Sequence, residues 1–272
     1  MTQPRTLTAA AIQMHSGADL NENLAQAGYL VGEAARQGAE LVALPEYFYL
    51  MPADERERVA LAEDFGRGRI QQLLADLARE HGIWLLGGTV PLAGAEPGKM
   101  YNSSVLFDPS GACATRYDKM HLFGYDADDM RYAEADTMSP GAAVATAATP
   151  WGPLRLSVCY DLRFPELYRQ GPAPSLITAP AAFTHTTGQA HWELLLRSRA
   201  VENLAFVIGA GQCGLHPGNK RTFGHSLIVD PWGEVLACRA DGPGVVLAEL
   251  DLQRQAELRA RLPALQHRRL AS

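Results

Sequence analysis

A cysteine at the end of a buried strand is the residue whose position most directly suggests chemistry. Cys159 follows the apolar run at residues 154–158 and precedes a turn that leads into a helix beginning near Pro165. Open α/β sheets usually build their sites at this edge, where a thiolate can attack an electrophilic carbon. The backbone N–H of Tyr160 is the candidate donor to the resulting oxyanion. Taken alone, a cysteine is more often a small buried hydrophobic residue.

Glu46 stands at the end of another apolar run, residues 40–44, directly after a proline. The neighbouring rings of Tyr47 and Phe48 would partly withdraw its carboxylate from water. A carboxylate placed in this way can accept the thiol proton and later donate it to a leaving amine. On its own, a Pro-Glu pair after a strand is more often the start of an ordinary loop.

Lys119 lies among aromatic and apolar residues, in the stretch at 116–123, rather than in a run of charges. A charged lysine cannot act as a base, but it can stabilise an oxyanion and hold carboxylates in place. The alternative is an exposed lysine paired with Asp118. Only the combination of thiol, carboxylate and ammonium favours catalysis.

These side chains require strands whose carboxyl ends meet at one edge of a sheet. Apolar runs typical of strands alternate with helical patterns, which indicates an α/β protein with a mixed sheet layered by helices. Turn signals at 109–111 and 231–233 predict hairpins after strands at 105–108 and 227–230. Further strands are predicted at residues 7–12, 40–44, 83–89, 154–158, 175–180 and 206–211, helices at 21–37, 70–80 and 192–203, and surface loops at 93–98 and 240–244.

The amino-acid composition indicates what kind of protein this is and which binding partners are excluded. The 272 residues are 47% hydrophobic, enough for a sizeable core, and the absence of a linker or repeat predicts one domain over residues 1–272. Lys and Arg total 24 against 30 Asp and Glu, a net charge of −6, which argues against nucleic acid and anionic membrane as partners. No secretory signal or bilayer-spanning run is visible, so we expect a cytoplasmic protein.

The cysteines do not suggest a disulfide framework. All four lie far apart without a C-x-x-C pair, and reduced thiols are expected. A metal site could be drawn from Cys213, His216, His225 and Cys238, but their spacing matches no common zinc pattern, so no metal is predicted.

Taken together, three motifs resemble those of the nitrilase, or carbon–nitrogen hydrolase, superfamily. They are Leu-Pro-Glu at 44–46, the lysine before Met-His-Leu-Phe at 120–123, and Cys-Tyr-Asp-Leu-Arg-Phe-Pro-Glu at 159–166. The resemblance extends from residues 10–13 to residues 230–234 and so covers nearly the whole chain. It implies a four-layer αββα sandwich, no cofactor, assembly into homodimers or larger homo-oligomers, and a catalytic triad of Glu46, Lys119 and Cys159.

The segment at 132–141 resembles the family stretch that supplies a second glutamate, and Glu134 has the matching position. It would orient Lys119 or the hydrolytic water, although a solvated loop carboxylate is the alternative. Many members carry Arg before the lysine where this chain has Asp118. This departure alters the local charge but leaves the lysine in place.

Within the superfamily, the motifs are most similar to the Nit branch, which includes deaminated-glutathione amidases and ω-amidases. The protein is therefore expected to be an amidase that releases ammonia from a small carboxylated amide. The alternatives are a carbamoylase or nitrilase with the same triad, or a non-catalytic binding protein on the same fold. Phe183 and Thr184 are expected to line the substrate pocket, whose shape depends on the loop at 124–136. Arg163 is a further candidate for substrate binding, although bracing of the nucleophile turn through a carboxylate is the favoured role.

Overall fold

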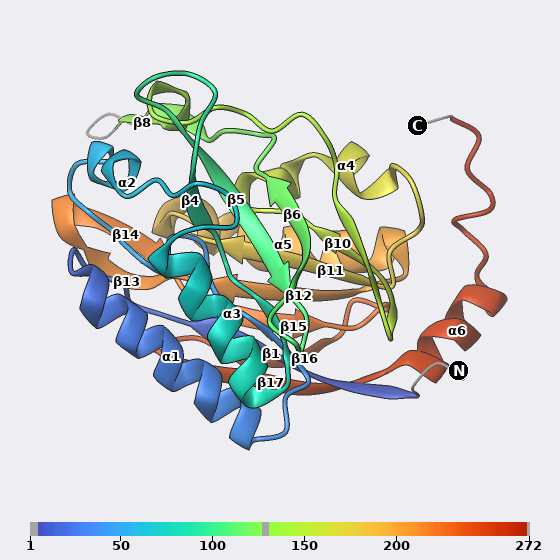
Figure 1. Cartoon of the computed structure of the whole chain (residues 1–272). Helices are drawn as coiled ribbons and strands as arrows, with labels where there is room; N and C mark the ends of the chain where they lie inside the picture. The colour runs from blue at the N-terminus through green and yellow to red at the C-terminus, as the bar shows by residue number, and fades with distance from the viewer. Residues whose placement is uncertain (1–4, 127–130, 271–272) are drawn as a thin grey trace.

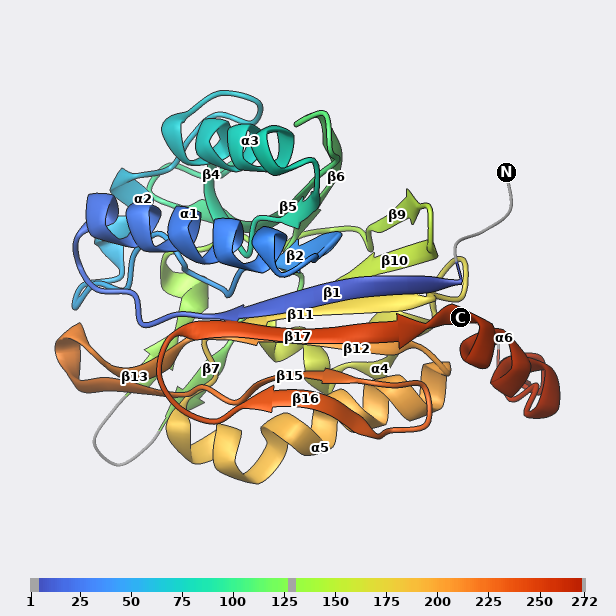
Figure 2. The same ribbon diagram turned by 90° about the horizontal axis from the view of Figure 1, so that it is seen from below.

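The chain folds into two β-sheets packed face to face between two layers of helices, and the computed structural model describes residues 5–126 and 131–270. Figure 2 shows the layers in order: α1 and α3, the sheet that carries β1 and β17, the sheet that carries β12 and β15, and α5. This is the four-layer αββα sandwich that the sequence predicted. The helices are α1 (Leu20–Arg36), α2 (Arg56–Ala60), α3 (Arg69–His81), α4 (Pro165–Arg169), α5 (His185–Asn203) and α6 (Leu252–Arg261), with the 3-10 turns η1 (Glu134–Asp136), η2 (Cys159–Arg163) and η3 (Pro217–Asn219).

The first sheet has seven strands and joins the two ends of the chain, because β1 pairs antiparallel with β17. β2 is parallel to both β1 and β3, so its carboxyl end points to the same edge as theirs. In spatial order the strands are β17 (Gly244–Asp251), β1 (Thr6–Gln13), β2 (Leu41–Ala43), β3 (Trp84–Leu86), β5 (Met100–Phe107) and β4 (Val90–Ala93), with β6 (Cys113–Asp118) also paired to β5.

The second sheet has six strands, and its central three, β10, β11 and β12, run parallel. In order they are β16 (Val235–Arg239), β15 (Ser226–Val229), β12 (Phe206–Gly211), β11 (Leu176–Ala181), β10 (Gly152–Leu156) and β9 (Thr146–Thr149). Two small hairpins lie outside these sheets, β13 (Cys213–His216) with β14 (Lys220–Phe223), and β7 (Gly124–Asp126) with β8 (Arg131–Ala133). Figure 1 places β14, α2 and β8 at the same side of the molecule.

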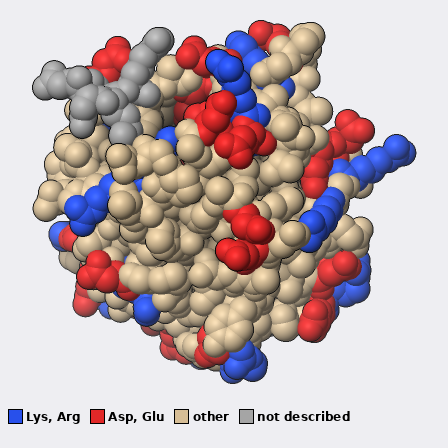
Figure 3. Space-filling model, turned by 90° about the vertical axis from the view of Figure 1, so that its left-hand side faces the viewer, with Lys and Arg blue, Asp and Glu red and all other residues tan. Residues whose placement is uncertain are grey.

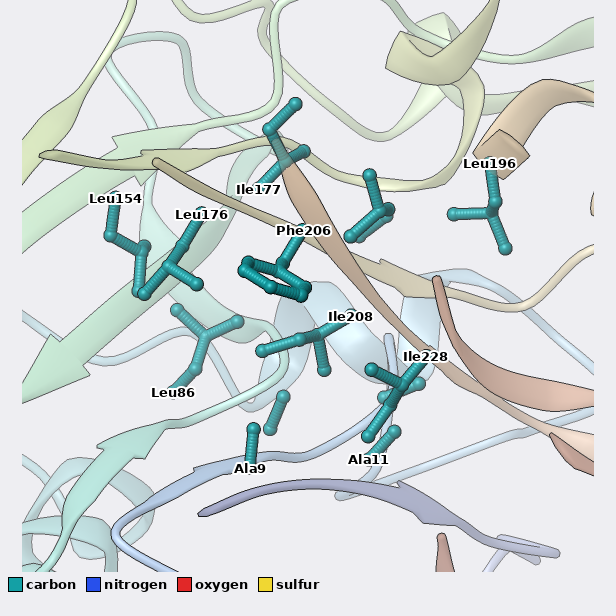
Figure 4. Close-up of a cluster of buried hydrophobic side chains, with 14 of the residues drawn as sticks. Ala9, Ala11, Leu86, Leu154, Leu176, Ile177, Leu196, Phe206, Ile208 and Ile228 are labelled. Atoms are coloured by element: carbon teal, nitrogen blue, oxygen red, sulfur yellow. The ribbon is translucent and has the colours of Figure 1, made fainter. Parts of the chain in front are cut away.

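Successive side chains of β1 point to opposite faces of the first sheet and contribute to two separate hydrophobic cores. Ala9 and Ala11 face the second sheet, whereas Ala10 and Ile12 face α1 and α3, as expected for a strand buried on both faces. Figure 4 shows side chains of the inter-sheet core, where Leu86 of the first sheet lies near Leu154 and Leu176 of the second.

Most predicted elements are present, with changes at their ends. The predicted strand at 83–89 ends at Leu86, because Gly88 has a left-handed φ of 54° and lies too close to the Pro45 carbonyl for a side chain. The predicted helix at 192–203 begins earlier, at His185, since the polar first turns are capped by the Thr184 side chain. Of the loop predicted at 124–136, residues 127–130 lie outside the described residues.

Among the residues that the structure describes, none of the helices combines the length and the apolar character needed to cross a membrane.

Candidate active site

Cys159 occupies the first position of η2, immediately beyond the end of β10. Its φ of 48° lies in the left-handed region, which is strained for a residue with a side chain and is often found at functional turns. The side chain is 8% exposed and lines a cavity of about 650 Å³. The turn therefore presents the sulfur to an enclosed space.

Asp161 holds this turn in place. Its buried carboxylate accepts the backbone N–H of Val158 at 2.8 Å and the hydroxyl of Tyr117 at 2.7 Å. The ring Nδ1 of His121 lies 2.7 Å from its second oxygen, and that ring stacks on Phe164 at 3.7 Å between centroids. The contacts from Tyr117 and His121 tie the second-sheet turn to the segment around β6.

Lys119 lies between two carboxylates. Its Nζ is 2.9 Å from Oε1 of Glu46 and 2.8 Å from both carboxylate oxygens of Glu134. Lys119 and Glu46 are each 1% exposed, and both glutamates line the cavity with Cys159. The structure thus brings together all four residues that the sequence placed in the catalytic centre.

Glu46 receives two further hydrogen bonds. Asn102 Nδ2 of β5 donates to Oε1 at 2.9 Å, and the backbone N–H of Ala182, directly after β11, donates to Oε2 at 2.8 Å. Three donors from both sheets therefore fix the orientation of the carboxylate. Asn102 belongs to no motif in the sequence, and its contact with Glu46 depends on the pairing of β5 with β3 and β4.

Glu134 is oriented by partners of its own. The hydroxyl of Tyr47 donates to Oε1 at 2.7 Å, and the backbone N–H of Phe123 donates to Oε2 at 2.7 Å. Sequence reasoning treated Tyr47 only as a ring beside Glu46. Its hydroxyl contact depends on the left-handed φ of 55° that Tyr47 adopts after the strand end.

The electrostatics of the centre favour a neutral thiol and a charged lysine. Burial, followed by the carboxylate of Glu46, raises the pKa of Cys159 well above its ordinary value, although Lys119 acts in the opposite direction. Burial alone would lower the pKa of Lys119, but the carboxylates of Glu134 and Glu46 raise it. A proton must therefore move from sulfur to an acceptor before or during attack on a substrate.

The predicted substrate contacts line the same cavity. Phe183 packs against Trp192 with 5.2 Å between ring centroids, and Thr184 uses its hydroxyl to cap α5. Tyr160 also lines the wall. The guanidinium of Arg163 lies over the rings of Tyr160 and Phe183 and contacts Nδ1 of His191 at 3.2 Å. Its partner in the structure is thus a histidine rather than the carboxylate that was expected.

Asp118 does not form an ion pair with Lys119. Its carboxylate instead accepts from Arg116 Nε at 2.8 Å and from the hydroxyl of Ser103. The negative charge of Asp118, next to Lys119 in the sequence, is therefore neutralised by Arg116 on the same strand.

His216, one of the four residues considered for a metal site, has both ring nitrogens engaged in other contacts. The ring nitrogens of His216 bond to the Ser16 carbonyl at 2.8 Å and to the Thr222 hydroxyl at 2.7 Å. Within residues 5–126 and 131–270, no group of three or more His, Cys, Asp or Glu side chains is arranged to hold a metal ion.

Comparisons with known proteins agree with this geometry. The family model described as carbon-nitrogen hydrolase matches residues 8–260. The chain is 41% identical to the deaminated glutathione amidase of Synechocystis sp., over 96% of this chain and 97% of that protein. It is 38% identical to human omega-amidase NIT2, over 96% of this chain and 94% of that protein. The crystal structure of Saccharomyces cerevisiae Nit3, a member of branch 10 of the nitrilase superfamily, has a TM-score of 0.87 at 31% identity and covers 98% of both chains.

Proposed function

The chain belongs to the carbon–nitrogen hydrolase family and is an amidase, and we propose that Cys159 is its nucleophile. We further propose that its substrates are small amides that carry a carboxylate, of the deaminated glutathione or α-ketoglutaramate type. The observation that carries the proposal is the enclosed thiol beside two carboxylates joined by one buried lysine.

In the proposed first half-reaction, Glu46 accepts the thiol proton while the sulfur of Cys159 attacks the amide carbon. The oxyanion forms near the ammonium of Lys119 and the N–H of Tyr160. Collapse of this intermediate restores the carbonyl as a thioester and breaks the carbon–nitrogen bond. The amine leaves with the proton that Glu46 carried, as ammonia from a primary amide or as a larger amine from a secondary amide.

In the second half-reaction, water gives a proton to Glu46 and attacks the thioester. Breaking the carbon–sulfur bond releases the carboxylic acid, and the sulfur regains its proton from Glu46. Glu134 holds Lys119 throughout, and its bonds from Tyr47 and Phe123 support that role. Glu46 thus serves as base, acid, base and acid in turn.

Replacement of the nucleophile tests this proposal. We expect Cys159→Ala to abolish turnover and covalent labelling by iodoacetamide at the site, while the matched control Cys238→Ala, on exposed β16, retains both. Acid release should be measured on deaminated glutathione, α-ketoglutaramate, aliphatic amides, N-carbamoyl amino acids and nitriles. Near-normal turnover by Cys159→Ala would refute the assignment, and turnover of carbamoyl compounds or nitriles alone would replace the amide substrates with those classes.

The proposal also covers the location of the protein in the cell and its oligomeric state. A cytoplasmic location is supported by four unpaired cysteines, two of them exposed, since such thiols persist in a reducing compartment. Assembly into a homodimer or larger homo-oligomer is supported by exposed apolar side chains on α5 and the adjacent turn, Leu194, Val201 and Trp232.

A further inference from the structure

The cavity extends well beyond the catalytic centre. Its walls run from Cys159 and Glu46 to the residues around α2 and to strand β14. Its volume of about 650 Å³ lies in the range, roughly 300–1,000 Å³, of pockets that enclose an entire drug-sized ligand. A five-carbon amide would occupy only part of this volume, so the cavity has room for a longer substrate.

Among the described residues, five cationic side chains line this cavity, and they fall into two groups. Arg58 and Lys220 both pair with the carboxylate of Glu55. The other three, Arg56, Arg163 and Arg221, have no carboxylate partner within the part of the chain that the structure describes. Their guanidinium groups are therefore available to a ligand carboxylate.

The three arginines without a carboxylate partner in the described ranges come from two parts of the cavity wall. Arg163 belongs to the same turn as Cys159, four residues further along η2, whereas Arg56 begins α2 and Arg221 lies on β14. Arg56 and Arg221 are exposed, as expected for residues at a mouth. Figure 3 shows the side of the molecule where α2 and β14 lie, with acidic and basic groups interspersed, so any anion recognition there is local.

The two segments at the mouth are fixed to each other. Lys220 Nζ donates to the carbonyls of Pro52 and Ala53, at 3.0 and 3.2 Å, and bonds to Glu55. The neighbouring carboxylate of Asp54 accepts the backbone N–H of Arg56 at 3.0 Å. These contacts pair the carboxylate of Glu55 with two cations and place Arg56 and Arg221 on a backbone that is held in position.

We propose that Arg56 and Arg221 form a carboxylate-binding subsite for the leaving group of an extended substrate. This inference rests on the proposed amidase function and specifies its substrate class: a secondary amide with one carboxylate on the acyl half, near Arg163, and a second at the far end of the amine half. Deaminated glutathione has this arrangement, because hydrolysis of its first amide gives α-ketoglutarate and a dipeptide that ends in a carboxylate. α-Ketoglutaramate lacks the second carboxylate.

The test compares three substrates that all release α-ketoglutarate: deaminated glutathione, its analogue with the terminal carboxylate replaced by an N-methylamide, and α-ketoglutaramate. For the wild type we expect kcat/KM to be roughly tenfold higher with the carboxylate than with the N-methylamide, and this preference should shrink as salt is added. The double variant Arg56→Gln/Arg221→Gln should lose the preference and its salt dependence, with little change on α-ketoglutaramate.

Arg261→Gln is the control for loss of a positive charge elsewhere on the surface, because it lies on exposed α6, which Figure 2 places at an end of the sandwich. It should retain the preference. An unchanged preference in the double variant, or an equal loss on all three substrates, would overturn the subsite while leaving the amidase assignment intact. Failure of the wild type to hydrolyse any amide would instead refute the proposed function.

Discussion

At Cys159 the fold places a thiol with a raised pKa beside Glu46, the proposed acceptor of its proton. Two carboxylates and one ammonium surround the sulfur, so the net local charge disfavours a resting thiolate. Burial acts in the same direction. In the proposed mechanism, Cys159 is therefore activated when Glu46 accepts its proton during attack, rather than by a stable thiolate ion pair before substrate binds.

This arrangement predicts the behaviour of Glu46→Gln. Removing a negative charge that raises the thiol pKa must lower that pKa, so alkylation of Cys159 by iodoacetamide should begin at lower pH than in the wild type. Turnover should nevertheless be lost, because glutamine cannot accept the proton. The alkylation rate is measured against pH by mass spectrometry, with Cys159→Ala as the blank for the exposed Cys113 and Cys238. A profile that stays in place or moves to higher pH contradicts the electrostatic role of Glu46.

The clustering of the candidate catalytic residues could be predicted because their positions are local properties of the sequence. Cys159 and Glu46 each follow a continuous apolar run, and such runs mark buried strands. The partners that orient them were not predictable in this way. Asn102 and Asp161 act through strand pairing and through contacts between distant segments, while Arg56 and Arg221 belong to no motif and meet only when β14 packs beside the residues before α2.

At the scale of elements, α5 connects the substrate wall to the second sheet. Its N-terminal Thr184 lines the cavity, and Gly188, one turn further on, packs directly on Phe223 of β14. The hydrophobic periodicity predicted only the C-terminal part of this helix, from residue 192. The first turns are polar and follow a capping threonine, so apolar spacing could not reveal them.

Gly188→Ala should therefore destabilise the protein, although alanine is ordinarily the better helix former. Its methyl group would overlap the Cβ and ring of Phe223, and overpacking of this kind costs about 1–3 kcal/mol. Gly28→Ala in α1 is the matched control, because its methyl group would lie 3.8 Å from Leu77, an ordinary contact, and should stabilise by roughly 0.5–1 kcal/mol. Urea unfolding measures both. Equal stabilisation by the two substitutions would show that α5 and β14 are not packed as described.

At the scale of the whole molecule, the two outer helical layers differ in their exposed apolar surface. On α5, Leu194 and Val201 are 63% and 48% exposed, and they lie seven residues apart on one helix face. Trp232, 57% exposed, follows β15 in the turn whose Gly233 lies against Val201. Grouped apolar side chains of this kind are typical of a protein–protein interface.

We expect the protein to sediment as a homodimer or larger assembly through this face. Val201→Glu should shift the distribution towards monomer, because it would bury a charge in an apolar contact. Tyr29→Glu, at a 66% exposed position on α1 in the opposite layer, should leave the assembly unchanged. Analytical ultracentrifugation over a range of concentrations distinguishes these cases. A wild type that stays monomeric at every concentration would refute the proposed assembly.

The division of the active site between the sheets also has a kinetic consequence for the newly made chain. Glu46 and Lys119 follow strands of the first sheet, Cys159 and Ala182 follow strands of the second, and β17 must return to β1 before the first sheet is complete. Contacts this distant in sequence form late in folding. During refolding, the helical signal should recover before hydrolytic turnover does, and a partly synthesised chain would carry its thiol without the residues that make it reactive.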